Sequence, residues 1–272
     1  DLEKLKAWLL EEGCTKVAME STGKHWIPIY NVLEDSFEIT LANARYVKNL
    51  PGRKTDDNDA RWIAKLLALG LIDGSFIPPK DIRELRDLTR RRQKLVNMRS
   101  SEKSRLIDIL RSNNIMISSV ASDVFGVSGM AIIRELISDD EPDTQSIANL
   151  AKRKLRNKIP ELIEALNGHL GNHQKILIKE ILEHLDFLDS QIAKLEEMID
   201  EKCEPFKELV DIIDSHPGID KISAQSIIAE IGTNMEVFHS AAHLASWCGL
   251  SPGNNESAGK KKALTLPQET NI

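Results

Sequence analysis

Residues 53–67 read RKTDDNDARWIAKLL, and this stretch decides the expected fold of the first part of the chain. A Pro-Gly turn signal at 51–52 precedes it, so a helix is expected to begin near Asp56. Asp56 and Asp59 are three residues apart and would share one face of that helix. Two carboxylates on a rigid face suit a hard cation such as Mg²⁺. Acidic residues are also ordinary at a helix start, where they face the positive end of the dipole. Taken alone, the stretch favours capping.

The residues before this stretch alternate between expected helices and expected strands. The helices lie at 2–10 and 24–33, and the strands lie at 15–20 and 37–42. Short connections between such elements indicate an α/β pattern with the two strands paired in parallel. In an α/β sheet, functional groups gather at the carboxyl ends of the strands, and Glu20 ends the first strand. Glu20 is therefore either a third metal ligand or a solvated charge at a strand end.

Two motifs in this region resemble those of a transposase family. Residues 18–23 read AMESTG and residues 54–60 read KTDDNDA. Their sequences and spacing resemble the DEDD transposases of bacterial insertion sequences, the insertion sequence 110 family, which also includes the Piv invertase. The resemblance covers nearly all of the chain. It implies a partial RNase H-like (RuvC-like) domain in which Glu20, Asp56 and Asp59 bind Mg²⁺ and take part in catalysis.

Composition limits the broad class of the protein. The chain has 272 residues, a formal net charge of −6 and three widely separated cysteines. An odd number of scattered cysteines indicates neither a disulfide framework nor a zinc site, and it fits a reducing, cytoplasmic setting. No apolar run is long enough to span a membrane.

Residues 80–111 form a basic stretch within this acidic chain. They contain eleven Lys or Arg residues against five Asp or Glu residues, and their leucines have helical spacing. Charge runs usually mean a solvated helix face. A local positive excess in an acidic chain nevertheless favours contacts with nucleic-acid phosphates. The residues predicted to make them are Arg90, Arg91, Arg92 and Lys94.

Residues 173–199 predict a long helix with a heptad seam. Its apolar residues recur three and four positions apart, at Leu185, Leu188, Ile192, Leu195 and Ile199. Such a seam either pairs with another protomer or folds back on an earlier helix. The resemblance implies a coiled coil between two domains, and we expect a homo-oligomer formed through it.

Residues 216–232 resemble a helix-hairpin-helix element. The sequence His-Pro-Gly-Ile at 216–219 predicts a tight turn. Backbone N–H groups in the turn and at the start of the next helix can hold a phosphate without reading bases. A purely structural turn is the alternative. The expected phosphate contacts involve Gly218 and Lys221.

Residues 255–262 read NESAGKKK and are similar to the C-terminal domain of the same family. In that domain a serine before a small-Gly-Lys run is the nucleophile. The resemblance gives this role to Ser257, with Lys260 near the phosphate, and Ser251 is the second candidate. Nearby lysines would stabilise a phosphate and developing negative charge on the hydroxyl oxygen. A lone serine near lysines is otherwise an ordinary loop residue.

The sequence departs from the family pattern at both ends. The first family carboxylate lies on a strand well upstream of Glu20, and Asp1 is not that residue. At the other end, residues 263–272 do not match the family's continuation. We therefore expect a chain truncated at both ends that does not catalyse strand exchange.

The sequence as a whole predicts a helix-rich α+β protein in three parts. These are a partial RNase H-like domain with the basic helix (1–112), a helical linker with a coiled coil (113–204) and an incomplete C-terminal domain with the helix-hairpin-helix element (205–272). The resemblance implies a DNA transposase or site-specific recombinase whose partners are DNA and a structured guide RNA. A RuvC-like junction nuclease that uses water as nucleophile and a nucleic-acid-binding remnant without chemistry are the alternatives.

Overall fold

The computed structural model describes residues 1–21, 23–42, 56–72, 74–138 and 143–250, and the short strands at 256–257 and 260–261. For residues 56–59 and the two short strands, it describes the backbone only. The chain forms two compact units. The sheet unit comprises Asp1–Pro79 with Asn234–Ile272, and the helical unit comprises Lys80–Thr233. This division differs from the three consecutive parts expected, because the sheet unit draws on both ends of the chain.

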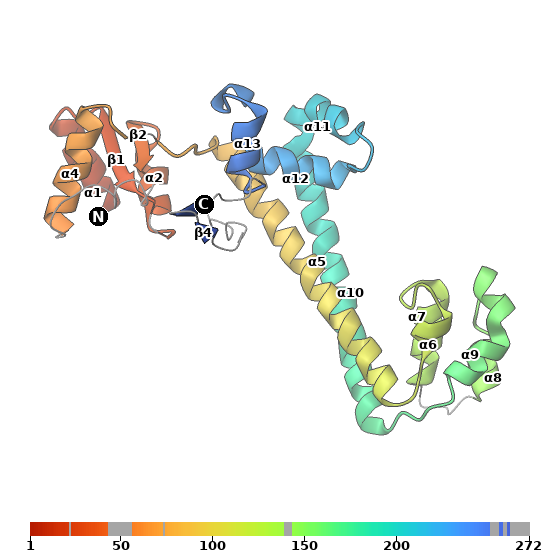
Figure 1. The fold of residues 1–272 in the computed structure, drawn as a ribbon. Helices are drawn as coiled ribbons and strands as arrows, with labels where there is room; N and C mark the ends of the chain where they lie inside the picture. The colour runs from red at the N-terminus through yellow and green to blue at the C-terminus, as the bar shows by residue number, and fades with distance from the viewer. Residues whose placement is uncertain are drawn as a thin grey trace. The chain divides into compact units, whose positions relative to one another are not determined.

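The first part of the sheet unit has the predicted order of elements (Figure 1). These are α1 (Leu2–Glu11), β1 (Lys16–Glu20), α2 (Trp26–Leu33), β2 (Glu38–Ala42) and α4 (Asp56–Ala68). β1 and β2 are parallel, as predicted, in a register that runs from Lys16 opposite Glu38 to Glu20 opposite Ala42. The crossover through α2 is what makes a parallel pair possible. Trp26 and Leu33 of α2, Phe37 before β2 and Leu41 of β2 are buried.

Aromatic packing brings the C-terminal segment into the same unit. This segment contains η3 (Met235–Val237), α13 (Ala241–Trp247), β3 (Glu256–Ser257) and β4 (Lys260–Lys261). The buried ring of Phe238 meets the ring of Phe76 edge-on at 5.8 Å between centroids, and that of Trp247 at 5.5 Å. Edge-to-face pairs of large rings are favourable. This contact therefore joins residues that precede the helical unit in the sequence to residues that follow it.

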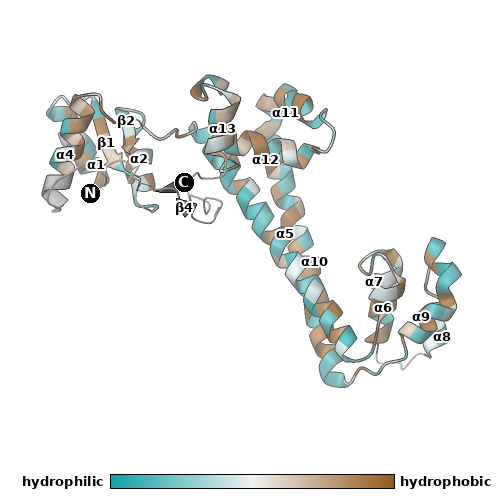
Figure 2. Ribbon diagram, viewed as in Figure 1, coloured by the Kyte–Doolittle hydropathy of each residue, from teal (hydrophilic) through white to brown (hydrophobic). Residues whose placement is uncertain are grey.

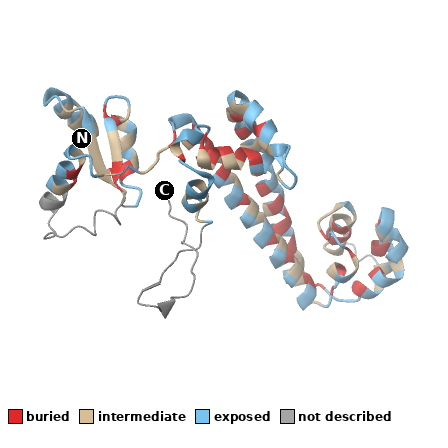
Figure 3. Cartoon of the chain, turned by 45° about the horizontal axis from the view of Figure 1, so that its top comes forward, coloured by how far each residue is buried: buried red, intermediate tan, exposed pale blue. Residues whose placement is uncertain are grey.

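Two long helices, α5 (Lys80–Ser112) and α10 (Asn172–Cys203), form the frame of the helical unit. Their residue numbers run in opposite directions along the contact, so the helices are antiparallel. Buried apolar residues of both helices meet at three levels: Leu106 and Leu110 with Leu182 and Leu185, Leu95 with Leu188 and Ile192, and Ile82 and Leu85 with Ile199. Apolar residues alternate with hydrophilic ones along both helices in Figure 2, and buried positions follow both in Figure 3.

The heptad seam predicted for residues 173–199 is therefore buried within the chain. Four of its five members are buried, and Leu195 is partly buried beside Leu188. The structure thus selects the alternative in which the helix folds back on an earlier helix. The same residues are not exposed for the homo-oligomer that was expected to form through this seam.

The ends of the α5–α10 pair carry the remaining helices of the unit. One end packs into a core with the connecting segment: α6 (Ile117–Val120), α7 (Val127–Leu136), α8 (Thr144–Ala148), η1 (Arg153–Lys158) and α9 (Ile159–Ala165). The other end packs against η2 (Glu204–Phe206), α11 (Lys207–Asp214) and α12 (Lys221–Ile231). Within the described residues, no helix has the length and apolar character needed to cross a membrane.

We predict that Leu188→Ala destabilises the helical unit far more than Phe187→Ala does. The Leu188 side chain is 1% exposed in the seam, whereas that of Phe187 is 57% exposed on the outer face. A cavity at Leu188 should lower the free energy of unfolding by about 2–5 kcal/mol. The exposed substitution should change it by about 0.5 kcal/mol or less. Urea denaturation followed by circular dichroism measures both, and equal losses would contradict an internal seam.

Candidate functional site

The predicted carboxylates lie on two elements that pack together. Glu20 is the last residue of β1 and is half-buried, and Asp56 and Asp59 occupy the first turn of α4. α4 packs against β1, so the carboxyl end of a parallel strand and an acidic helix start belong to one small domain. The side chains of Asp56 and Asp59 lie outside the described residues. Oxygen ligands of this kind fit Mg²⁺. Among the side chains that are described, no group of three or more His, Cys, Asp or Glu residues is placed to hold a metal ion.

The predicted nucleophile lies on a short antiparallel pair of strands. In the pairing of β3 with β4, Ser257 is directly opposite Lys260. Their side chains lie outside the described residues, as does the second candidate, Ser251. The backbone register therefore makes a basic residue the cross-strand neighbour of Ser257.

Two of the predicted phosphate-binding arginines on α5 are engaged within the chain. The Arg90 guanidinium donates two hydrogen bonds to the Glu230 carboxylate, at 2.7 and 2.8 Å. Arg92 donates to Glu196 at 2.8 and 2.6 Å. Arg91 and Lys94 are exposed, and neither forms an ion pair with a carboxylate of the described residues. Within this cluster, the positive charge that remains uncompensated is that of Arg91 and Lys94.

Arg86, which the sequence analysis did not single out, is a buried anchor for α12. Its side chain is 7% exposed and donates to the backbone carbonyls of Ala229 at 3.0 Å and Glu230 at 2.7 Å. These carbonyls belong to the last turn of α12, where a cation is favoured and carbonyls lack intrahelical partners. Burial lowers the pKa of Arg86, and the nearby Glu230 carboxylate opposes that shift. The partners of Arg86 lie more than 140 residues away in the sequence, so no local sequence pattern predicts these hydrogen bonds.

Two helices, α11 and α12, flank the turn at 216–219 where a helix-hairpin-helix element was expected, and a carboxylate occupies the start of the second helix. Gly218, with φ of +91°, allows the turn between α11 and α12. The Asp220 carboxylate accepts a hydrogen bond from the Ser223 amide at 2.8 Å. Hydrogen bonds from the hydroxyl and the amide of Ser223 hold the pKa of Asp220 below its usual range. This charged cap occupies the place at which a phosphate was expected.

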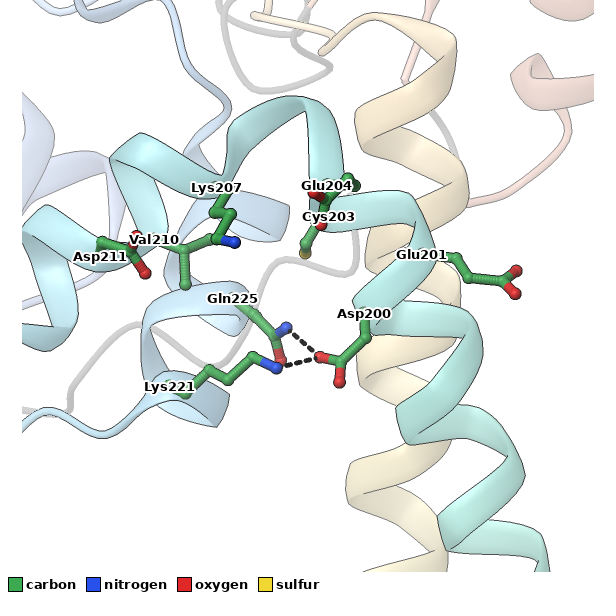
Figure 4. Close-up of a pocket in the computed structure, with 9 residues that line it drawn as sticks. All are labelled: Asp200, Glu201, Cys203, Glu204, Lys207, Val210, Asp211, Lys221 and Gln225. Carbon is green, nitrogen blue, oxygen red and sulfur yellow. Dashed lines mark hydrogen bonds and ion pairs between the residues drawn. The ribbon is translucent and has the colours of Figure 1, made fainter.

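Lys221 is also engaged, at the edge of a pocket of ≈550 Å³ formed by the end of α10 with α11 and α12 (Figure 4). The Asp200 carboxylate receives hydrogen bonds from Lys221 and from Gln225, each at 2.7 Å. The bond from Lys221, followed by that from Gln225, lowers the pKa of Asp200. Burial raises the pKa of the Cys203 thiol in the same pocket to about 11, so it stays protonated at neutral pH. The hydrogen bonds to Asp200 therefore hold α12 against α10. The protonated Cys203 thiol is not an activated nucleophile.

Comparison with known families yields two matches. Residues 1–115 match a family model of DEDD transposases related to IS110, described as Transposase. Residues 210–269 match a model described as Transposase IS116/IS110/IS902 family. The first match contains Glu20, Asp56 and Asp59, and the second contains Ser257. A search of curated proteins found no match to the chain.

We predict that Arg86→Met destabilises the helical unit while Arg91→Met does not. Methionine keeps the apolar length of the side chain but leaves the carbonyls of Ala229 and Glu230 without their donor. Loss of these charge-assisted hydrogen bonds should lower the free energy of unfolding by about 1.5–3 kcal/mol. Arg86→Lys should restore only part of it, because an ammonium group lacks the planar fork. Denaturant titrations measure all three variants, and a full rescue by lysine would contradict the two-carbonyl anchor.

Proposed function

The chain belongs to the IS110-type transposases, and we propose that it carries the carboxylates and the serine with which a transposase of this family cleaves and joins DNA strands for an insertion sequence. The observation that carries this proposal is that the sheet unit contains both ends of the chain. The predicted carboxylates and the predicted serine therefore belong to the same compact unit, although more than 190 residues separate Asp59 from Ser257. A joint active site needs these residues close together, and their location in one compact unit supports that.

The carboxylate half of the proposal is an RNase H-like site. Glu20, Asp56 and Asp59 would hold Mg²⁺, supported by the packing of α4 against β1. When bound, the metal would supply electrostatic stabilisation for the charge on the phosphoryl oxygens. In this proposal, the end of β1 supplies Glu20, and the first turn of α4 supplies Asp56 and Asp59.

The serine half of the proposal is a covalent exchange of phosphate esters. The Ser257 oxygen attacks the phosphorus of a DNA phosphodiester, a serine–phosphate bond forms, and one deoxyribose oxygen leaves. The serine proton passes to a base and the leaving oxygen takes up a proton, so the number of phosphate ester bonds is unchanged. Lys260 supports this step because it is the cross-strand neighbour of Ser257 and a cation stabilises the charged phosphate.

The helical unit would serve nucleic-acid binding. In this proposal, the α5–α10 pair is the coiled coil implied by the family resemblance, and the partners are DNA and a structured guide RNA. Arg91 and Lys94 are the residues of the predicted cluster best suited to phosphate contacts, because their charges are exposed and uncompensated by described carboxylates. Arg90 and Arg92 would contribute less, because Glu230 and Glu196 already neutralise them.

We predict that Ser257→Ala abolishes a covalent protein–DNA adduct while DNA binding persists. The alanine removes the attacking oxygen and leaves the basic surfaces unchanged. The test uses protein expressed from its full reading frame, with Mg²⁺, RNA and labelled DNA, followed by denaturing electrophoresis. Ser251→Ala is the matched control and should retain the adduct.

An adduct that survives in Ser257→Ala and disappears in Ser251→Ala would show that Ser251 is the nucleophile instead. Cleavage that proceeds in wild-type protein without any adduct would favour the junction-nuclease alternative, in which water is the nucleophile.

We also predict that the double variant Arg91→Gln/Lys94→Gln weakens nucleic-acid binding and flattens its salt dependence. Removal of each phosphate-binding cation should reduce the slope of log K against log salt by about 0.9 on duplex DNA. The matched control Arg90→Gln/Arg92→Gln removes the same charge from residues that have carboxylate partners, and it should alter the slope less. Fluorescence anisotropy over a salt series measures both. Equal slopes in the two variants would contradict the assignment.

A further inference from the structure

A second basic cluster lies in the connecting segment between α5 and α10. Residues 152–158 read KRKLRNK and hold five basic residues, with no acidic residue between Asp143 and Glu161. We call residues 152–158 the basic segment. All five of its basic side chains are exposed. In a chain with a net charge of −6, such a concentration of one sign is unusual.

The basic segment differs from α5 in what its charges contact. On α5, Arg90, Arg92 and Arg99 pair with carboxylates of other helices. No basic side chain of the basic segment forms an ion pair with a carboxylate of the described residues; the Lys158 ammonium donates only to the Val120 carbonyl, at 3.4 Å. Within the described residues, no carboxylate therefore neutralises the five neighbouring charges of the basic segment.

The fold holds the basic segment in place. Ala151 before it is buried, and the Lys152 amide donates to the Ser128 hydroxyl at 2.9 Å. Arg153 has φ of +53°, a left-handed conformation that non-glycine residues rarely adopt unless their surroundings impose it. Leu155 packs against the core that contains Leu106 and Ile178. These contacts hold the backbone of the basic segment in a defined conformation.

The 3₁₀ geometry of η1 sorts the side chains by face. Leu155 faces the core, and Lys154 and Arg156, one residue before and after it, lie on the other faces of the turn. Arg153 precedes them with a positive φ. The side chains of Arg153, Lys154 and Arg156 are all exposed.

The chemistry of this surface fits the phosphate backbone of a duplex. Guanidinium and ammonium groups bind phosphate oxygens, and Arg does so through two parallel hydrogen bonds. Surfaces that bind single strands add aromatic rings for base stacking. The chain has no Phe, Trp or Tyr between Phe125 and Phe187, and Phe125 packs against the core under the Lys103 ammonium.

We propose that Arg153, Lys154 and Arg156 form a docking surface for the phosphate backbone of double-stranded DNA, the partner that the family match indicates, separate from the cluster on α5. The surface rests on its own charge and geometry and does not require the proposed chemistry at Ser257. It would hold the connecting segment against a duplex without reading its sequence.

The test compares two triple variants of the 272-residue chain. Arg153→Gln/Lys154→Gln/Arg156→Gln removes the surface, and Lys4→Gln/Lys179→Gln/Lys194→Gln removes the same charge from exposed lysines elsewhere. Anisotropy titrations over a salt series use labelled DNA and RNA duplexes of arbitrary sequence. The first variant should lower the slope of log K against log salt by about 2–3 and weaken binding about tenfold or more at low salt. The loss should be at least as large on the DNA duplex as on the RNA duplex, and a loss confined to the RNA duplex would overturn the assignment to DNA.

Equal losses in the two variants, or no loss in the first, would overturn the proposal. So would a loss of binding to phosphatidylserine vesicles in the first variant with unchanged duplex binding. A second measurement needs no substitution: acetylation of lysines in the wild-type chain, read by mass spectrometry with and without duplex. Lys154 should be protected at least severalfold more than Lys179, and equal reactivity of the two lysines would overturn the proposal as well.

Discussion

The apolar seam between α5 and α10 is the contact on which the helical unit depends. The two helices have 33 and 32 residues, and since most helical stability in proteins comes from packing of an apolar face, burial of their facing stripes holds them together. Both ends of the seam continue into other cores. Leu106 belongs to the core with Leu162, and Ile82 belongs to the core with Ile228. Loss of the seam would therefore uncouple the connecting segment from α11 and α12, because among the described residues the cores at the two ends of the helical pair share no residue.

Once the seam fixes the facing sides of the two helices, it also decides which charges are neutralised. Arg92 and Arg99 come beside carboxylates of α10, and Arg90 comes beside Glu230 of α12. These are mostly exposed or half-exposed pairs, so each contributes only modestly to stability. Their larger effect is on the surface field, since a paired arginine attracts a phosphate less than a free one. No carboxylate of the described residues pairs with the basic segment at η1, so its positive charge is more available to a phosphate.

The sheet unit depends on a different constraint, the return of the chain after the helical unit. The ring of Phe238 packs against Phe76, which precedes α5, and against Trp247 of α13. This packing places the C-terminal segment in the unit that carries Glu20 and the acidic start of α4. The proposed division of labour follows from it: one unit for phosphate chemistry and the other for holding nucleic acid.

The sequence by itself determined the first helices and strands and the long helices. Strand and helix periodicity predicted the parallel pair β1–β2 and the acidic start of α4, and heptad spacing predicted α10 together with its buried seam. These are local patterns, and the physics that selects them acts over a few residues. Only the tertiary structure decided which helix covers the seam and which of the basic residues have carboxylate partners. It also decided that Arg86 anchors α12. Each of these depends on contacts between residues about 70 to 144 positions apart, and no local spacing encodes a partner at that distance.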